Sequence, residues 1–114
     1  MSLSYSDVGE NLRKIVITGR LDTPGTDSVA STLEALAAEP KKAVVVDLSS
    51  LQFLASIGIR SLIICAKAVQ QRGGKMTLVV GDNSLVSMSL EATGVDDLIP
   101  AFKTAAEAER AAMA

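Results

Sequence analysis

The sequence predicts a small α/β domain whose sheet is parallel or mixed. Short runs rich in Val, Ile and Leu end at glycine or at polar turn residues, and longer segments with helically spaced apolar side chains follow them. Strands that alternate with helices need crossover connections, which favour parallel pairing. A chain of 114 residues has room for one hydrophobic core, so we expect a single domain over residues 1–114.

The first half of the chain is expected to hold three strands and one helix. Strands are predicted at residues 3–8 and 14–19, the second of which is rich in β-branched side chains and stops at a glycine. Thr23 is expected to cap the first helix, with a proline at the first helical position, and Pro40 is expected to end it. Residues 43–46 (AVVV) show no polar alternation, which predicts a strand buried on both faces.

The second half is expected to hold the longest helix, which begins at Ser56 and runs to about residue 71. Apolar side chains such as Ile59 and Leu62 recur there at helical spacing, and two glycines then stop the helix. We interpret residues 51–54 as a connection. The other elements expected are a strand at 75–80, a short helix at 84–93, an edge strand at 97–100 and an alanine-rich helix at 104–113.

The composition argues against several functional classes. The net charge is −2 and aromatic residues make up only 3% of the chain, so neither a basic face nor base-stacking platforms for nucleic acid are expected. The absence of histidine excludes His-dependent catalytic triads and most zinc sites. The apolar runs are too short to insert into a membrane, and no signal peptide is apparent. We therefore expect a cytoplasmic protein without a cofactor and without nucleic-acid binding.

Residues 47–67 (DLSSLQFLASIGIRSLIICAK) carry the most informative pattern. A buried strand ends there, the chain turns, and a helix begins at Ser56. As an N-cap, the Ser56 hydroxyl would accept a hydrogen bond from a following amide, which is worth about 1 kcal/mol. A phosphate on Ser56 would face the positive end of the helix dipole, which is a favourable place for an anion. Ser56 is thus either a cap alone or a hydroxyl whose modification changes an exposed surface.

The ordered set of motifs resembles the STAS domains, the anti-sigma factor antagonist family. That family carries the pattern D-L-S-x-x-x-F-x-D-S-[ST]-G-L-x-x-L between a strand and a helix. The matching residues here are Asp47, Leu48, Ser49, Phe53, Ser56, Gly58, Ile59 and Leu62. The segments GRLD at 19–22, GGKMTLVV at 73–80 and TGV at 93–95 extend the resemblance over nearly the whole chain. It implies the STAS fold, with a mixed sheet of four to five strands and about four helices.

The resemblance also implies a function and a site. In this family the serine that corresponds to Ser56 is phosphorylated by a serine kinase that is also an anti-sigma factor, and a PP2C-type phosphatase removes the phosphate. The chain would then act in partner switching, as a binding protein and not as an enzyme. An apolar patch near Ile57 and Ile59 is expected to supply affinity. The expected partner-binding residues are Asp22, Thr23, Ala55, Ser56, Ile57, Gly58, Ile59 and Arg60.

Two departures from the family pattern leave an alternative open. Ala55 stands where the family has an acidic residue, and Ile57 stands where it has Ser or Thr. Both changes affect the surroundings of the phosphoacceptor. The alternative is a STAS subunit that does not switch, in a larger complex such as a lipid-transport ATPase.

Other polar residues are expected to have structural roles. Asp47 is predicted to anchor its loop by accepting backbone N–H bonds, and Asp82 and Asn83 are predicted to form a turn. Asp22 and Thr23 are expected to cap a helix, with partner contact as the other interpretation. Cys65 lies in an apolar run and is expected to be an inert core residue. We see no nucleophile with a base nearby, so an enzyme is not expected.

Overall fold

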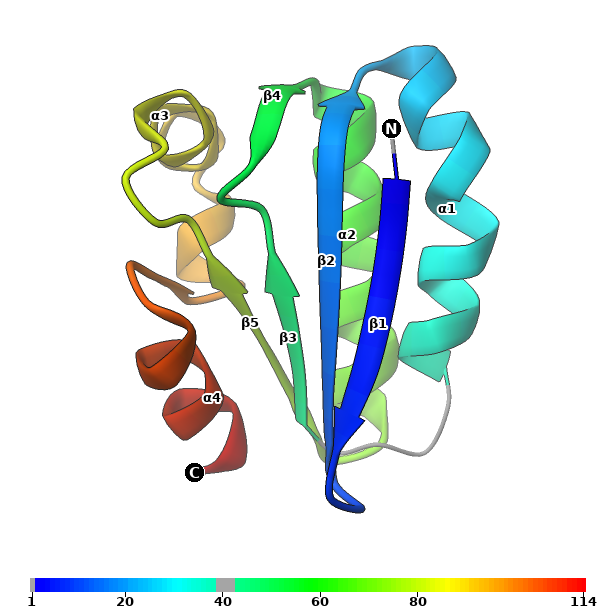
Figure 1. The fold of residues 1–114 in the computed structure, drawn as a ribbon, viewed down its shortest axis with the longest axis vertical. Helices are drawn as coiled ribbons and strands as arrows, with labels where there is room; N and C mark the ends of the chain where they lie inside the picture. Colours follow the sequence, from blue (N-terminus) through cyan, green and yellow to red (C-terminus); the bar gives the residue numbers. More distant parts are fainter. Residues whose placement is uncertain (1, 39–42) are drawn as a thin grey trace.

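The computed structural model describes residues 2–38 and 43–114 and confirms the α/β class (Figure 1). The predicted helix stop at Pro40 lies outside these residues. The elements follow the order β1 (Ser2–Val8), β2 (Leu12–Leu21), α1 (Thr23–Ala38), β3 (Ala43–Asp47), β4 (Leu51–Leu54), α2 (Ser56–Gln71), β5 (Lys75–Val79), α3 (Ser84–Thr93), a 3₁₀ turn (Val95–Asp97), β6 (Ala101–Phe102) and α4 (Ala105–Met113).

The sheet is mixed, as expected. Its order is β1-β2-β3-β5-β6, where β1 runs antiparallel to β2 and the other pairs are parallel. The strand β4 also pairs with β2, so the interpretation of residues 51–54 as a connection is wrong. The cause is the length of β2. The shorter β3 pairs only with its Leu12–Val16 part, which leaves the Gly19–Leu21 end free to pair with β4.

The edge strand lies later in the chain than predicted. Residues 95–97 form a 3₁₀ turn, and β6 begins only at Ala101. The cause is burial of Val95 and Ile99, which places these two side chains in the core and keeps the segment between them out of the sheet. The carbonyl of Pro100 nevertheless accepts a hydrogen bond from the Leu78 N–H at 2.9 Å, so pairing with β5 starts at this proline.

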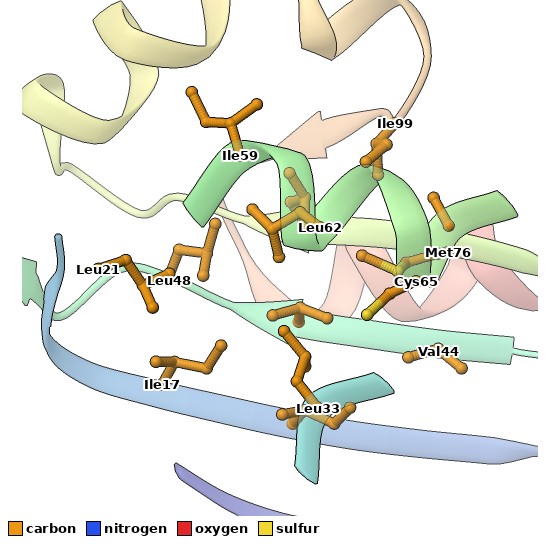
Figure 2. Packing of buried hydrophobic residues seen from close by; sticks show 14 of the residues in the cluster. Ile17, Leu21, Leu33, Val44, Leu48, Ile59, Leu62, Cys65, Met76 and Ile99 are labelled. Atoms are coloured by element: carbon orange, nitrogen blue, oxygen red, sulfur yellow. The ribbon is translucent and has the colours of Figure 1, made fainter. Parts of the chain in front are cut away.

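The core has two layers, one on each face of the sheet. Val44 and Val46 of β3 pack with α1 and α2 on one face, whereas Ala43 and Val45 pack with α4 on the other. This alternation confirms the prediction that β3 is buried on both faces. Figure 2 shows the larger layer, in which side chains from the strands meet Leu33 of α1 and a row from α2.

Candidate functional site

Ser56 lies at the solvent-exposed start of α2, at the edge of the sheet where β2 and β4 end (Figure 1). The N–H of Ala55 donates to the Leu21 carbonyl at 2.9 Å, which ties this helix start to the end of β2. The hydroxyl of Ser56 makes no hydrogen bond to the residues that the structure describes. An exposed hydroxyl without a partner is chemically available for modification.

The prediction that Ser56 caps α2 is wrong, because Ala55 occupies the N-cap position. Ala55 has an extended backbone (φ −91°, ψ 165°), and its carbonyl accepts the first helical bonds from Gly58 at 3.0 Å and Ile59 at 3.1 Å. Alanine has no side-chain acceptor, so no side chain caps this helix. Ser56 is instead the first helical residue, and its hydroxyl carries no capping role.

The electrostatic surroundings of Ser56 favour an anion. The first turn of α2 contains no acidic residue and its amides have no side-chain cap, so the positive end of the helix dipole is not neutralised there. Arg60 lies four residues along the same helix, which places it over the same face one turn away. Its side chain is exposed and makes no ion pair within the described residues. A phosphate on Ser56 would therefore have a cation within reach.

Two residues expected on the partner surface are buried instead. An added Cβ at Gly58 would stand 2.9 Å from the Leu21 Cβ and 3.1 Å from the Leu21 carbonyl oxygen, so Gly58 permits the close approach of α2 to β2. Ile59 is 6% exposed and belongs to the same core cluster as Leu62, and Figure 2 shows both side chains on α2. The expectation that Ile59 contributes to an exposed apolar patch is corrected, because it lies on the inward stripe of the helix. Ile57 is half-buried.

The loop between β2 and α1 borders the start of α2. Asp22, not Thr23, caps α1: its Oδ1 accepts from the Gly25 N–H at 2.9 Å, and Thr23 is the first helical residue. The hydrogen bond from the Gly25 N–H has the largest effect and lowers the pKa of Asp22. Desolvation comes next and raises it, and the Arg20 guanidinium lowers it further, so the net shift of the pKa is downward. Thr23 is exposed. Asp22 therefore shapes this loop by capping.

A pair of residues near this loop was missed by the sequence analysis. The Arg20 guanidinium lies over the Phe53 ring, 4.7 Å from its centroid, and its Nε donates to Asp22 Oδ2 at 3.2 Å. The pair forms because β4 aligns Phe53 with Arg20 of β2. Recognising β4 as a strand would have revealed it. Phe53 remains 37% exposed, so a ring and a cation together present a surface beside the two helix starts.

The loop between β3 and β4 is held by polar side chains. Asp47 Oδ1 accepts from the Ser49 N–H at 2.9 Å and from its hydroxyl at 2.6 Å, which confirms the predicted loop anchor. Asn83 does more than form a turn. Its Nδ2 donates to the carbonyls of Ser49 at 3.1 Å and Leu51 at 2.8 Å, and its Oδ1 caps α3 by accepting from Val86. These bonds position β4 and, through it, the start of α2.

The remaining candidate groups, a buried cysteine and the acidic side chains, show neither a reactive nucleophile nor a metal site in the part of the chain that the structure describes. Cys65 is fully buried, and desolvation, with a smaller contribution from the Glu34 carboxylate, raises the pKa of its thiol to about 12. Such a thiol stays protonated and unreactive. Over residues 2–38 and 43–114, no three His, Cys, Asp or Glu side chains come together in a way that could hold a metal ion. Within the same residues, no helix is long and apolar enough to cross a membrane.

Several solved structures are similar to this chain in fold. Among solved structures, an anti-sigma factor antagonist from Mycobacterium paratuberculosis is similar at 22% identity with a TM-score of 0.80, covering 99% of this chain and 96% of that one. The phosphorylated form of the Bacillus cell fate determinant SpoIIAA is similar at 14% identity with a TM-score of 0.69, covering 94% and 96%. The STAS domain of a SulP transporter from Vibrio cholerae is similar at 21% identity with a TM-score of 0.69, covering 95% and 85%.

These structural similarities show the fold alone, and the family is assigned by comparison of the sequence with family profiles. No curated protein matches the chain. The family profile of the STAS domain matches residues 7–108, which is most of the 114 residues and includes both helix starts described above. The chain therefore belongs to the STAS domain family.

Proposed function

We propose that this protein is an anti-sigma factor antagonist that acts by partner switching in the cytoplasm, as a single domain over residues 1–114. In this proposal it binds a serine kinase that is also an anti-sigma factor, and phosphorylation of Ser56 ends the complex. A PP2C-type phosphatase restores the binding form. The single observation that carries the proposal is the exposed, unbonded hydroxyl of Ser56 at an uncapped helix N-terminus. The phosphorylated form of SpoIIAA has the same fold and supports the analogy.

Phosphorylation at this position would leave the fold intact. The dianion would meet the positive end of the α2 dipole and could pair with Arg60 one turn along, and no neighbouring hydrogen bond needs to break. The absence of a carboxylate at Ala55 removes a group that would otherwise repel the phosphate. Ala55 therefore changes how a kinase recognises the site without making the product unstable.

The surface around Ser56 suits a partner that docks only when the serine is unmodified. Ile57 is half-buried and Phe53 is 37% exposed, so apolar area lies close to the hydroxyl. Binding would desolvate that area, and a phosphate carrying a charge of about −2 would have to lose its hydration at the same time. The cost of desolvating the charge explains why modification would release the partner.

The test is phosphorylation by a serine kinase of the GHKL type from the same genome, with ATP and with detection by intact mass. The exposed serine that begins α3, Ser84, is a matched control because it also occupies the first position of a helix. We expect Ser56→Ala to abolish phosphate incorporation and Ser84→Ala to leave it unchanged. We also expect Ser56→Asp to lose binding to the kinase. Unchanged incorporation in Ser56→Ala, or normal binding by Ser56→Asp, would exclude the switch.

A second candidate is a subunit of a larger assembly that does not switch, such as a lipid-transport ATPase complex. The observation that favours it is the combination of Ala55 and Ile57 beside the serine with the similarity to a transporter STAS domain. In this case the protein would copurify with an ATPase subunit, and Ser56→Asp would not disturb the complex. The same variant thus separates the two candidates.

A further inference from the structure

A shallow groove runs between α1 and α2 on the outer side of this helix pair. The two helices pack side by side, and both begin at the edge of the sheet where β2 and β4 end (Figure 1). The groove is lined by Asp27, Ala30 and Glu34 of α1 and by Ile57, Arg60 and Ile64 of α2. Ile64 is 46% exposed, which is high for an isoleucine on a helix whose other face lies in the core.

The charges beside this groove follow a regular pattern. Asp27 and Glu34 lie four and eleven positions after the first residue of α1, and Arg60 and Lys67 lie four and eleven positions after the first residue of α2. A separation of seven residues keeps side chains on nearly the same helix face. At the same distance from the helix starts, α1 therefore carries an acidic side chain and α2 a basic one. None of the four makes a hydrogen bond or an ion pair within the described residues.

This pattern is complementary to itself. A two-fold axis parallel to the helices places α1 of one copy over α2 of the other. Rotation about this axis does not change a residue's position along the helix direction, so residues equally far from the helix starts face each other. Asp27 then faces Arg60 of the second copy, and Glu34 faces Lys67. Symmetry repeats both pairs, as in an isologous interface. An axis perpendicular to the helices would instead oppose acidic α1 to acidic α1, which is unfavourable.

We propose that this groove is a homodimer interface in which α1 packs over α2 of a second copy, with Ile64 near its centre and Ile57 at the end where the helices begin. Each helix has 16 residues, so the pair presents a face about 24 Å long and about 20 Å wide. The dimer would bury roughly 1,000 Å² in total, close to the lower limit for specific interfaces. An interface at this limit is typical of weak, transient association, so we expect the dimer to be detectable at chain concentrations in the micromolar to millimolar range at low salt. This proposal does not depend on phosphorylation of Ser56.

The test is sedimentation equilibrium of the full chain over a wide concentration range, using charge reversals. Arg60→Glu with Lys67→Glu makes both helices acidic, and Asp27→Lys with Glu34→Lys makes both basic. Each variant loses four exposed ion pairs and gains repulsion, so its self-association should weaken by roughly 100-fold or more. An equimolar mixture of the two variants should associate again, because each acidic helix then meets a basic one. This rescue also shows that both variants are folded.

Two controls separate the groove from general charge effects. Lys103→Glu with Arg110→Glu changes the net charge as much as the acidic variant does but lies outside the groove, and it should leave the dimer constant within about twofold. Raising the salt concentration from 0.05 to 0.5 M should weaken the wild-type dimer several-fold because exposed pairs are screened. A wild-type chain that stays monomeric at about 1 mM, or a mixture that does not associate, would overturn the proposal.

Discussion

Replacing Gly58 by alanine tests whether close packing or helix propensity decides the stability of the α2 start. Gly58 lies in the first turn of α2, where alanine is normally preferred over glycine by about 1 kcal/mol. The added Cβ, however, would stand 2.9 Å from the Leu21 Cβ, 3.1 Å from the Leu21 carbonyl oxygen and 3.2 Å from Leu54 Cδ1. Two of these atoms belong to β2 close to its backbone and cannot turn away as the end of a flexible side chain can.

The two effects have opposite signs, so the measurement is decisive. Overpacking costs about 1–3 kcal/mol in general, and we expect about 2–3 kcal/mol here because two of the three close atoms lie at the Leu21 backbone. This cost exceeds the gain of about 1 kcal/mol in helix propensity. We expect Gly58→Ala to lower the free energy of unfolding by roughly 1–2 kcal/mol and the Tm by roughly 5–10 °C. Ser56, two residues away, would shift with the helix start, so phosphorylation or binding that depends on it should weaken as well.

The assay is urea unfolding followed by circular dichroism, with Gly and Ala variants at Gln70 as a calibration. Gln70 is exposed on the same helix, so the difference in stability between its Gly and Ala variants measures the helical preference for alanine over glycine without a contribution from packing. If Gly58→Ala is as stable as wild type or more stable, the close contact between α2 and Leu21 does not constrain the helix, and helix propensity decides the stability of the α2 start instead.

Three other predictions concern buried or titrating groups. Thr26→Val and Ser61→Ala remove hydroxyls that are buried without a hydrogen-bond partner in the described residues, so each should raise stability by up to about 1 kcal/mol in urea unfolding; a loss would show that these hydroxyls are satisfied. Asp22→Ala should lower the Tm at pH 7. Because the pKa of Asp22 is lowered in the folded state, its contribution is present above its ordinary pKa and is lost as the pH falls through the folded value, so wild type and variant should converge in acid; a constant difference would contradict this. The raised pKa of Cys65, about 12 against an ordinary 9.0, makes stability fall as the pH rises above about 9. Cys65→Ala should remove that part of the slope, and the native thiol should react with a disulfide reagent only on unfolding.

The local sequence pattern was sufficient to predict which residues are buried wherever apolar residues recur with a regular period. The run at residues 43–46 is apolar at every position, and the structure buries it on both faces. The apolar stripe of α2 was visible from spacing alone, and it also implied that Ile59 points inward. Its expected place on the partner surface conflicted with that stripe, and the structure resolves the conflict in favour of burial. Periodicity is reliable here because the hydrophobic effect acts on whole helix faces.

The tertiary structure decided the features that depend on contacts between distant segments. Residues 51–54 became a strand because the end of β2 extends past β3 and offers free backbone groups, which no local pattern records. The cap of α2 lies at Ala55 and not at Ser56 because a cap is set by the backbone direction at the helix entry, and the Leu21 carbonyl fixes that direction at Ala55. Of the two residues expected to cap α1, only Asp22 does so. The motif places a serine near a helix start. Whether its hydroxyl faces solvent or the sheet depends on how α2 is turned about its axis, and the packing of Gly58 on Leu21 fixes that orientation.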